Sequence, residues 1–203
     1  SSMLNFILKA SVIATCIAKT PILFPRNPGV SLQTIAPFPN SISQKLMKIQ
    51  NVVIIGSGTM GSGIAAHLCN ADVPVTLLDL TTEISEKARD RIFKSKPPLL
   101  LDKSQIKNIR VGNINDNFDI VKEADWVVEA VVERIDIKHN IYEKIFKNRK
   151  PGAIVSSNTS SIPIKVLSEK LTKEEKKDFC ITHFFNPVRY MGLLEIVKNE
   201  NND

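Results

Sequence analysis

From residue 49 onward, short runs of β-branched and aliphatic residues alternate with longer segments in which apolar residues recur every three or four positions. The short runs predict buried strands, and the periodic segments predict helices that pack on a sheet. We expect strands at residues 52–55, 75–78, 109–111, 126–132, 153–155, 179–183 and 193–197. We expect helices after residue 58 and over residues 83–94, 135–146 and 163–171. This alternation predicts an α/β fold with a doubly wound, mostly parallel sheet and helices on both faces.

The first 46 residues differ from the rest of the chain: they contain five of the eleven prolines and no Asp or Glu. We interpret residues 1–46 as an N-terminal extension and residues 47–203 as one domain. The extension resembles acid-poor organellar presequences, although Arg26 is its only arginine. The alternative is that it precedes the true start of the protein, since Met47 comes just before the first strand. We expect a cytoplasmic protein, or a mitochondrial-matrix protein if the extension is a presequence.

The composition excludes several classes of protein. Of the 203 residues, 43% are hydrophobic and 24% are charged, which is typical of a globular domain. The net charge of +6 comes mainly from residues 1–50, which leave 22 basic and 21 acidic residues in the remainder, so we expect no nucleic-acid partner. No apolar run reaches the ~18 residues of a membrane-spanning helix, so no membrane span is expected. The three cysteines are widely separated, and we expect neither a metal site nor a disulfide framework.

A cluster of glycines follows the first predicted strand and opens the first predicted helix. The segment Gly56-Ser57-Gly58-Thr59-Met60-Gly61 has the spacing G-x-G-x-x-G. In such a loop the first glycine permits a tight turn, the second lets a pyrophosphate approach the backbone, and the third lets the helix pack close to the strand. The helix N-terminus adds unpaired N–H groups for the phosphates. The pattern predicts a Rossmann-type dinucleotide site.

Asp79 ends the second predicted strand, 18 residues after Gly61. A carboxylate at this place accepts hydrogen bonds from the adenosine ribose of a dinucleotide. It also repels the additional phosphate of NADP, and the following residues Leu80, Thr81 and Thr82 supply no arginine to offset that repulsion. We therefore expect NAD as the cofactor.

The candidate catalytic groups are His183 and Glu195. His183 ends an apolar strand, where catalytic groups of open parallel sheets lie, and Glu195 follows inside another apolar run. If the chain reverses between them, the two side chains face each other and the carboxylate fixes the imidazole tautomer. The alternative is a structural histidine and an unrelated edge glutamate. His67 and His139 lie in predicted helices and are interpreted as surface or interface residues.

Another polar cluster, residues 156–161, follows the predicted strand at 153–155. Its hydroxyl and amide groups either line the cofactor crevice or cap the helix that begins near Pro163, a role suited to Ser161. Residue chemistry alone leaves both interpretations open.

Together these segments resemble the NAD-binding domain of the 3-hydroxyacyl-CoA dehydrogenase family over roughly residues 48–199. The resemblance rests on residues 53–63, 126–138, 157–161 and the run His183-Phe184-Phe185-Asn186-Pro187 continuing to Glu195. The sequence of these segments is similar to that of bacterial multidomain enzymes, in which an enoyl-CoA hydratase module follows the dehydrogenase module.

The resemblance implies a role for each matching residue. It places NAD on residues 56–61 and Asp79, with Glu133 and Lys138 at further NAD-contact positions. It makes His183 the catalytic base and Glu195 its partner, with Ser160 touching substrate and nicotinamide and Asn186 beside the histidine. The implied reaction is the oxidation of a 3-hydroxyacyl-CoA to a 3-oxoacyl-CoA, as in fatty-acid β-oxidation.

Members of this family carry a second, helical domain, and the matching part of this chain ends soon after Glu195. We therefore expect a helical partner domain or chain, with a homodimer as a further option. The competing interpretations are a dinucleotide-binding module without turnover, and another hydroxyacid dehydrogenase. The latter lack the His-Phe-Phe-Asn-Pro run, and many use a lysine as the acid or base.

Overall fold

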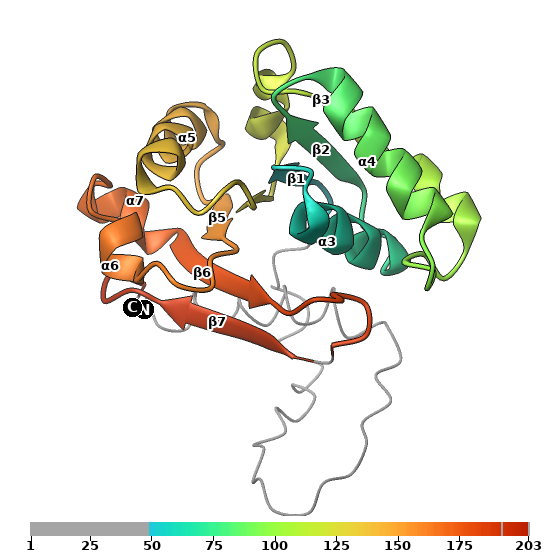
Figure 1. The fold of residues 1–203 in the computed structure, drawn as a ribbon. Helices are drawn as coiled ribbons and strands as arrows, with labels where there is room; N and C mark the ends of the chain where they lie inside the picture. Colours follow the sequence, from blue (N-terminus) through green and yellow to red (C-terminus); the bar gives the residue numbers. More distant parts are fainter. Residues whose placement is uncertain (1–48, 192, 203) are drawn as a thin grey trace, which may run out of the picture.

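The computed structural model describes residues 49–191 and 193–202, so the extension predicted at residues 1–46 lies outside the described residues. One seven-stranded sheet organises this part of the chain, in the order β3-β2-β1-β4-β5-β6-β7 (Figure 1). All neighbouring strands are parallel except β6 and β7, which are antiparallel. The strands are β1 Val52–Ile55, β2 Val75–Asp79, β3 Ile109–Asn113, β4 Trp126–Glu129, β5 Ile154–Ser157, β6 Phe179–Phe184 and β7 Leu194–Lys198.

Helices cover both faces of the sheet, because each face carries its own row of apolar side chains. One row packs against α3 and α4, around Ile54, Leu68 and Trp126. The other packs against α5, α6 and the 3-10 helix η2, around Val127 and Tyr142. The helices are α3 Thr59–Asn70, α4 Thr82–Lys94, α5 Ile135–Asn148, α6 Ile164–Leu167 and α7 Lys173–Lys177, with the 3-10 helices η1 Lys103–Asn108 and η2 Phe118–Glu123 (Figure 1).

This topology confirms the predicted α/β class and the doubly wound, Rossmann-type sheet. The chain crosses from β1 outward to β3 on one side and then returns to continue from β4 on the other side. Ligands of such sheets bind outside the carboxyl ends of the strands, at the point where the strand order reverses. In this protein that point lies between β1 and β4.

One predicted strand ends earlier than the apolar run suggested. The sequence predicts a strand over residues 126–132, but β4 ends at Glu129. The Val131 N–H is bonded to the carboxylate of Glu129, 2.8 Å away, and Val132 is exposed. A side chain thus takes over the hydrogen bonding of the backbone, and the chain turns away from the sheet.

The helix predicted over residues 163–171 is also wrong in extent, because α6 stops at Leu167. The Ser168 hydroxyl bonds back to the Ile164 carbonyl, which competes with continued helical pairing. A second helix, α7, then starts after Thr172 with a reciprocal cap between Thr172 and Glu175.

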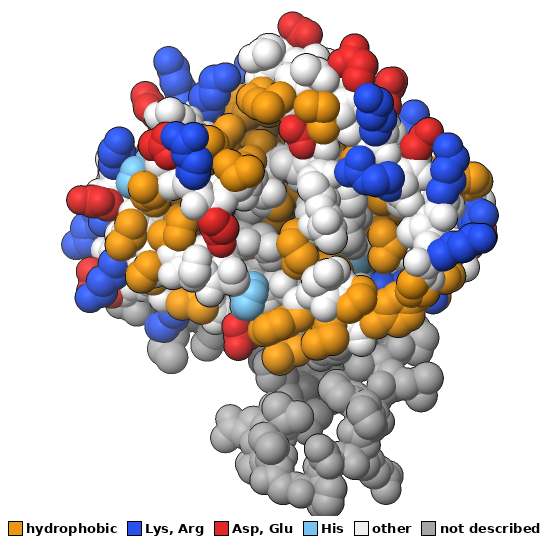
Figure 2. Space-filling model, in the orientation of Figure 1, with side chains coloured by type: hydrophobic (Ala, Val, Ile, Leu, Met, Phe, Trp, Pro, Cys, Tyr) orange, Lys and Arg blue, Asp and Glu red, His pale blue; other side chains and the backbone are white. Residues whose placement is uncertain are grey.

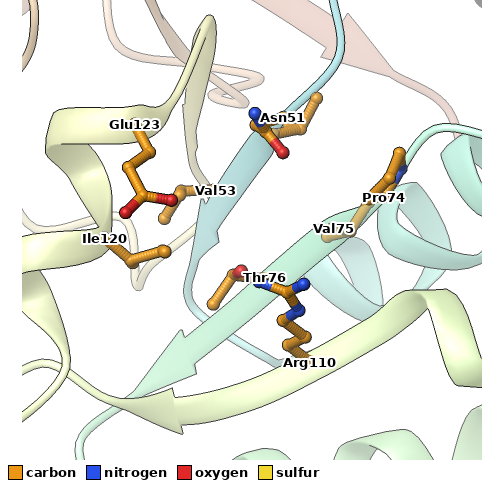
Figure 3. Close-up of a pocket in the computed structure, with 9 residues that line it drawn as sticks. Asn51, Val53, Pro74, Val75, Thr76, Arg110, Ile120 and Glu123 are labelled. Atoms are coloured by element: carbon orange, nitrogen blue, oxygen red, sulfur yellow. The ribbon is translucent and has the colours of Figure 1, made fainter.

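A small crevice opens at the amino ends of β1 and β2, far along the strands from the glycine loop (Figure 3). Asn51, Pro74, Arg110 and Glu123 line it, and it has room for about one water molecule. The crevice is therefore not a cofactor site. Among the described residues, no helix combines the length and apolar character needed to cross a bilayer.

Candidate functional site

The glycine loop joins β1 to α3 at the reversal point of the sheet. Gly56 has φ +103°, a left-handed conformation that L side chains rarely adopt. A Cβ on Gly56 would lie 2.5 Å from the Ala130 carbonyl oxygen, and one on Gly61 would lie 1.8 Å from the Gly56 carbonyl oxygen. Both glycines are therefore required by the close approach of three backbone segments.

Gly58 differs, because no protein atom lies within 4 Å of the place its Cβ would occupy. It is the N-cap residue of α3, and no side chain caps the first-turn N–H groups at the positive end of the helix dipole. A pyrophosphate fits this cradle in size and charge, so the loop suits a dinucleotide.

Asp79 holds the loop from the end of β2. Its Oδ2 accepts hydrogen bonds from the Ser57 N–H and the Ser57 hydroxyl, both at 2.6 Å. Arg91 reaches across from α4 and donates to the Ser57 carbonyl at 3.1 Å. The sequence reasoning missed Arg91, since nothing in its helical segment distinguishes it from its charged neighbours. Ser57 is thus held through its amide, hydroxyl and carbonyl groups, and the loop is preorganised.

Two carboxylates and a lysine meet near the end of β4: Glu129 is the last residue of that strand, and Glu133 and Lys138 follow it. Lys138, on α5, lies 2.7 Å from Glu129 Oε1 and 3.1 Å from Glu133 Oε2. The Lys138 and Glu129 side chains have no exposed surface, whereas 39% of the Glu133 side chain is exposed. Glu133 therefore reaches the protein surface. Lys138, which the resemblance placed at an NAD contact, touches Glu133 instead of the surface.

Glu133 remains ionised at neutral pH. Partial burial would raise its pKa, but hydrogen bonds from the Ser160 amide and the Thr159 hydroxyl, together with the charge of Lys138, lower the pKa below its ordinary value. Those bonds measure 3.0 Å and 2.8 Å to Glu133 Oε1. A charged acceptor is thus held at the surface beside the loop that carries Thr159 and Ser160.

His183 and Glu195 lie opposite each other on the antiparallel pair β6 and β7. The imidazole Nδ1 lies 2.9 Å from Glu195 Oε2, so the predicted facing of the two groups is confirmed. The Phe185 ring packs 4.4 Å from the imidazole, centroid to centroid, and limits its rotation. The Glu195 side chain is 53% exposed and that of His183 is 21% exposed. The pair is therefore accessible to solvent.

The polar cluster after β5 divides between two roles. Ser156 and Ser157 are buried, and their hydroxyls bond to Trp126 and Glu129. Asn158 uses its side-chain oxygen to accept the Phe184 N–H at 2.9 Å, which ties this loop to the strand that carries His183.

The capping role suggested for Ser161 is wrong. The N-cap residue of α6 is Pro163, without a side-chain hydrogen bond, and the Thr159 hydroxyl accepts the Ile162 N–H instead. Ser160 is exposed beside Glu133, and Asn186 is exposed in the β6–β7 connection, where each can meet a ligand.

The surface assignment of the other two histidines is also wrong, because both are buried. His139 Nε2 lies 2.9 Å from the Val166 carbonyl. His67 Nδ1 has no hydrogen-bond partner among the described residues, and burial, with the charge of Arg189, lowers the His67 pKa. The apolar pattern of one helix could not predict that these histidines are buried, because their neighbours come from distant segments: α6 for His139 and the β6–β7 connection for His67.

Comparisons with known proteins identify the family of this domain. Residues 51–203 match the family described as 3-hydroxyacyl-CoA dehydrogenase, NAD binding domain. The chain is 38% identical over 164 residues to the probable 3-hydroxyacyl-CoA dehydrogenase of Deinococcus radiodurans, covering 77% of this chain and 47% of that protein. It is 42% identical over 157 residues to the putative fatty acid oxidation complex trifunctional enzyme of Rickettsia felis, covering 74% of this chain and 22% of that protein.

A solved structure is similar in fold as well. The (S)-3-hydroxybutyryl-CoA dehydrogenase of Ralstonia eutropha has a TM-score of 0.64 and 30% identity, covering 76% of this chain and 57% of that one. The chain thus spans between 22% and 57% of the length of these three relatives. Sequence, fold and glycine cradle agree: the chain belongs to the 3-hydroxyacyl-CoA dehydrogenase family and comprises its NAD-binding domain.

Proposed function

We propose that this chain transfers hydride between NAD and C3 of a 3-hydroxyacyl-CoA, giving a 3-oxoacyl-CoA. The observation that carries the proposal is the His183–Glu195 pair, 2.9 Å apart, at the same carboxyl edge of the sheet as the glycine cradle. The names of the relatives, which include a fatty acid oxidation complex, support a role in fatty-acid β-oxidation.

The geometry of the pair defines the role of each group. A carboxylate only accepts hydrogen bonds, so the 2.9 Å contact requires the proton to reside on His183 Nδ1. The Nε2 lone pair is then available to take the proton from the 3-hydroxyl group of the substrate. Glu195 stabilises the imidazolium that forms. Bound NAD supplies the acceptor for the hydride.

The remaining contacts are assigned to residues at the same edge. The glycine loop receives the pyrophosphate, Asp79 the adenosine ribose, and Glu133 a further part of NAD. We assign Ser160 and Asn186 to the substrate. Both side chains are exposed; Ser160 bonds to Glu133 through its amide, and Asn186 lies three residues after His183.

A helical partner, as a further domain or a separate chain, is part of this proposal. Hydrophobic side chains gather along the lower rim of the molecule, over β7 and the β6–β7 connection (Figure 2). Tyr190, Met191, Leu193 and Val197 are each about half exposed there, close in sequence to the catalytic pair. Apolar surface of this kind marks an interaction site.

The proposal is tested by reduction of acetoacetyl-CoA with NADH, followed by the loss of NADH absorbance. We expect the 203-residue chain to bind NAD but to turn over slowly, because an open site positions the thioester poorly. Adding the separately expressed helical half of a relative should raise the rate. Absence of turnover in the presence of that half would favour the alternative, a dinucleotide-binding module without turnover.

NAD is expected to bind at least about tenfold more tightly than NADP, a difference of only ~1.4 kcal/mol. The reason is the Asp79 carboxylate, whose Oδ2 lies at the loop and repels a phosphate on the ribose. Calorimetric titration with both nucleotides measures the ratio. Asp79→Asn keeps the shape but removes the charge, and should bring the ratio toward one. A native chain that prefers NADP would contradict this assignment.

A further inference from the structure

Glu129 has no role in the proposed function, yet its carboxylate accepts four hydrogen bonds. Its Oε1 accepts from Lys138 Nζ at 2.7 Å and from the Val131 N–H at 2.8 Å. Its Oε2 accepts from the Tyr142 hydroxyl at 2.6 Å and from the Ser157 hydroxyl at 2.7 Å. The side chain has no exposed surface. A buried carboxylate with four short donors is held in one position.

Glu129 and Lys138 form a buried ion pair whose charges cancel. Lys138 is buried as completely as Glu129, and a buried ammonium needs a matching negative charge. Burial and the charge of Glu129 raise the Tyr142 pKa, so that the phenol stays neutral and acts as a donor. Glu129 therefore neutralises Lys138, and the charge of Glu133 remains uncompensated within the group.

Glu133 depends on Lys138 for its orientation. Its Oε2 faces Lys138 Nζ at 3.1 Å, while its Oε1 accepts from the Thr159 hydroxyl and the Ser160 amide. A chain of polar contacts thus runs from the buried Glu129 through Lys138 to the exposed Glu133, and from there to the loop that carries Ser160.

We propose that Glu129 is a positioning residue for NAD: it fixes and neutralises Lys138, and Lys138 in turn holds Glu133 at the protein surface as an available carboxylate. The inference rests on the proposed contact between Glu133 and NAD. It extends that proposal to a residue with no access to the ligand. Without the charge of Glu129, Glu133 is the one acidic partner of Lys138 within hydrogen-bond reach among the described residues, and Lys138 draws that carboxylate away from the cofactor.

The experiment measures NAD affinity by calorimetry and melting temperature on the same variants of the full chain. Glu129→Gln should weaken NAD binding roughly tenfold, the size of one lost charge-assisted hydrogen bond, and lower the melting temperature. Tyr142→Phe is the matched control: it removes a donor to Oε2 but leaves the Lys138 contact, so it should lower the melting temperature and keep the affinity.

The double variant Glu129→Gln with Lys138→Met separates positioning from folding, and it remains informative if Glu129→Gln alone does not fold. It contains no unpaired buried charge, so its melting temperature should recover. Its NAD affinity should stay weak, because Glu133 keeps only the bonds from Thr159 and Ser160 to Oε1 and loses the Lys138 contact that orients Oε2. Recovery of both properties would show a purely structural role and overturn the inference. Unchanged affinity in Glu129→Gln would do the same while leaving the proposed function intact, whereas a native chain without NAD affinity would overturn both.

Discussion

His183→Gln is expected to lower kcat for acetoacetyl-CoA reduction by ~10²–10⁴-fold, the usual contribution of a general base. Glutamine keeps a polar side chain near the position of Nδ1 but has no basic nitrogen at the position of Nε2. With Nδ1 engaged by Glu195, Nε2 is the nitrogen left to exchange the proton, which it takes from the 3-hydroxyl in oxidation and gives to the C3 oxygen in reduction, so the loss falls on proton transfer. The measurement uses the chain supplied with the helical half of a relative, with NADH absorbance as the readout.

NAD affinity is the control for this variant, because His183 lies on β6 and not at the glycine cradle. It should remain within about twofold of the native value, which corresponds to less than ~0.5 kcal/mol. Glu195→Gln should also reduce kcat, by a smaller factor, since it removes the charge that stabilises the imidazolium but leaves Nε2 in place. Near-normal turnover of His183→Gln would remove His183 from the catalytic role.

The parts of the site that lie within one segment could be predicted from the sequence. The glycine loop, its strand and its helix are contiguous, so the spacing of Gly56, Gly58 and Gly61 already encodes their tasks. The facing of His183 and Glu195 was also predictable, because a short reversal between two apolar runs forms an antiparallel pair with defined register. Both are local consequences of residue order.

The parts that depend on packing between distant segments could not be predicted. Arg91 reaches the Ser57 carbonyl only because α4 lies beside the glycine loop. The β6–β7 connection packs on α3, where Val188 leaves no room for a Cβ on Gly63, and its Arg189 acts on the buried His67.

Glu129 was missed although the sequence contained a signal for it. It is the one carboxylate inside the apolar run 126–132, and a charge in a buried strand is costly unless it is paired. That signal called for a partner, but it could not identify Lys138, Tyr142 and Ser157, which come from a helix and a neighbouring strand. A buried acidic residue at the end of a parallel strand therefore marks a network whose members only the fold reveals.

Substitution of two glycines in the same loop should separate cofactor binding from folding. Gly58→Ala places a methyl group in open space, so the free energy of unfolding should change by less than ~1 kcal/mol. The same methyl group occupies the cradle, and NAD affinity should fall more than tenfold, or over ~1.4 kcal/mol.

Gly61→Ala instead places a methyl group 1.8 Å from the Gly56 carbonyl oxygen, and α3 must move away from β1. We expect this variant to lose ~1–3 kcal/mol of stability, as in other overpacked cores. Its NAD binding should become too weak to measure. Denaturant unfolding and calorimetry on both variants provide the comparison. If Gly58→Ala binds NAD as tightly as the native chain, the pyrophosphate does not lie against this glycine.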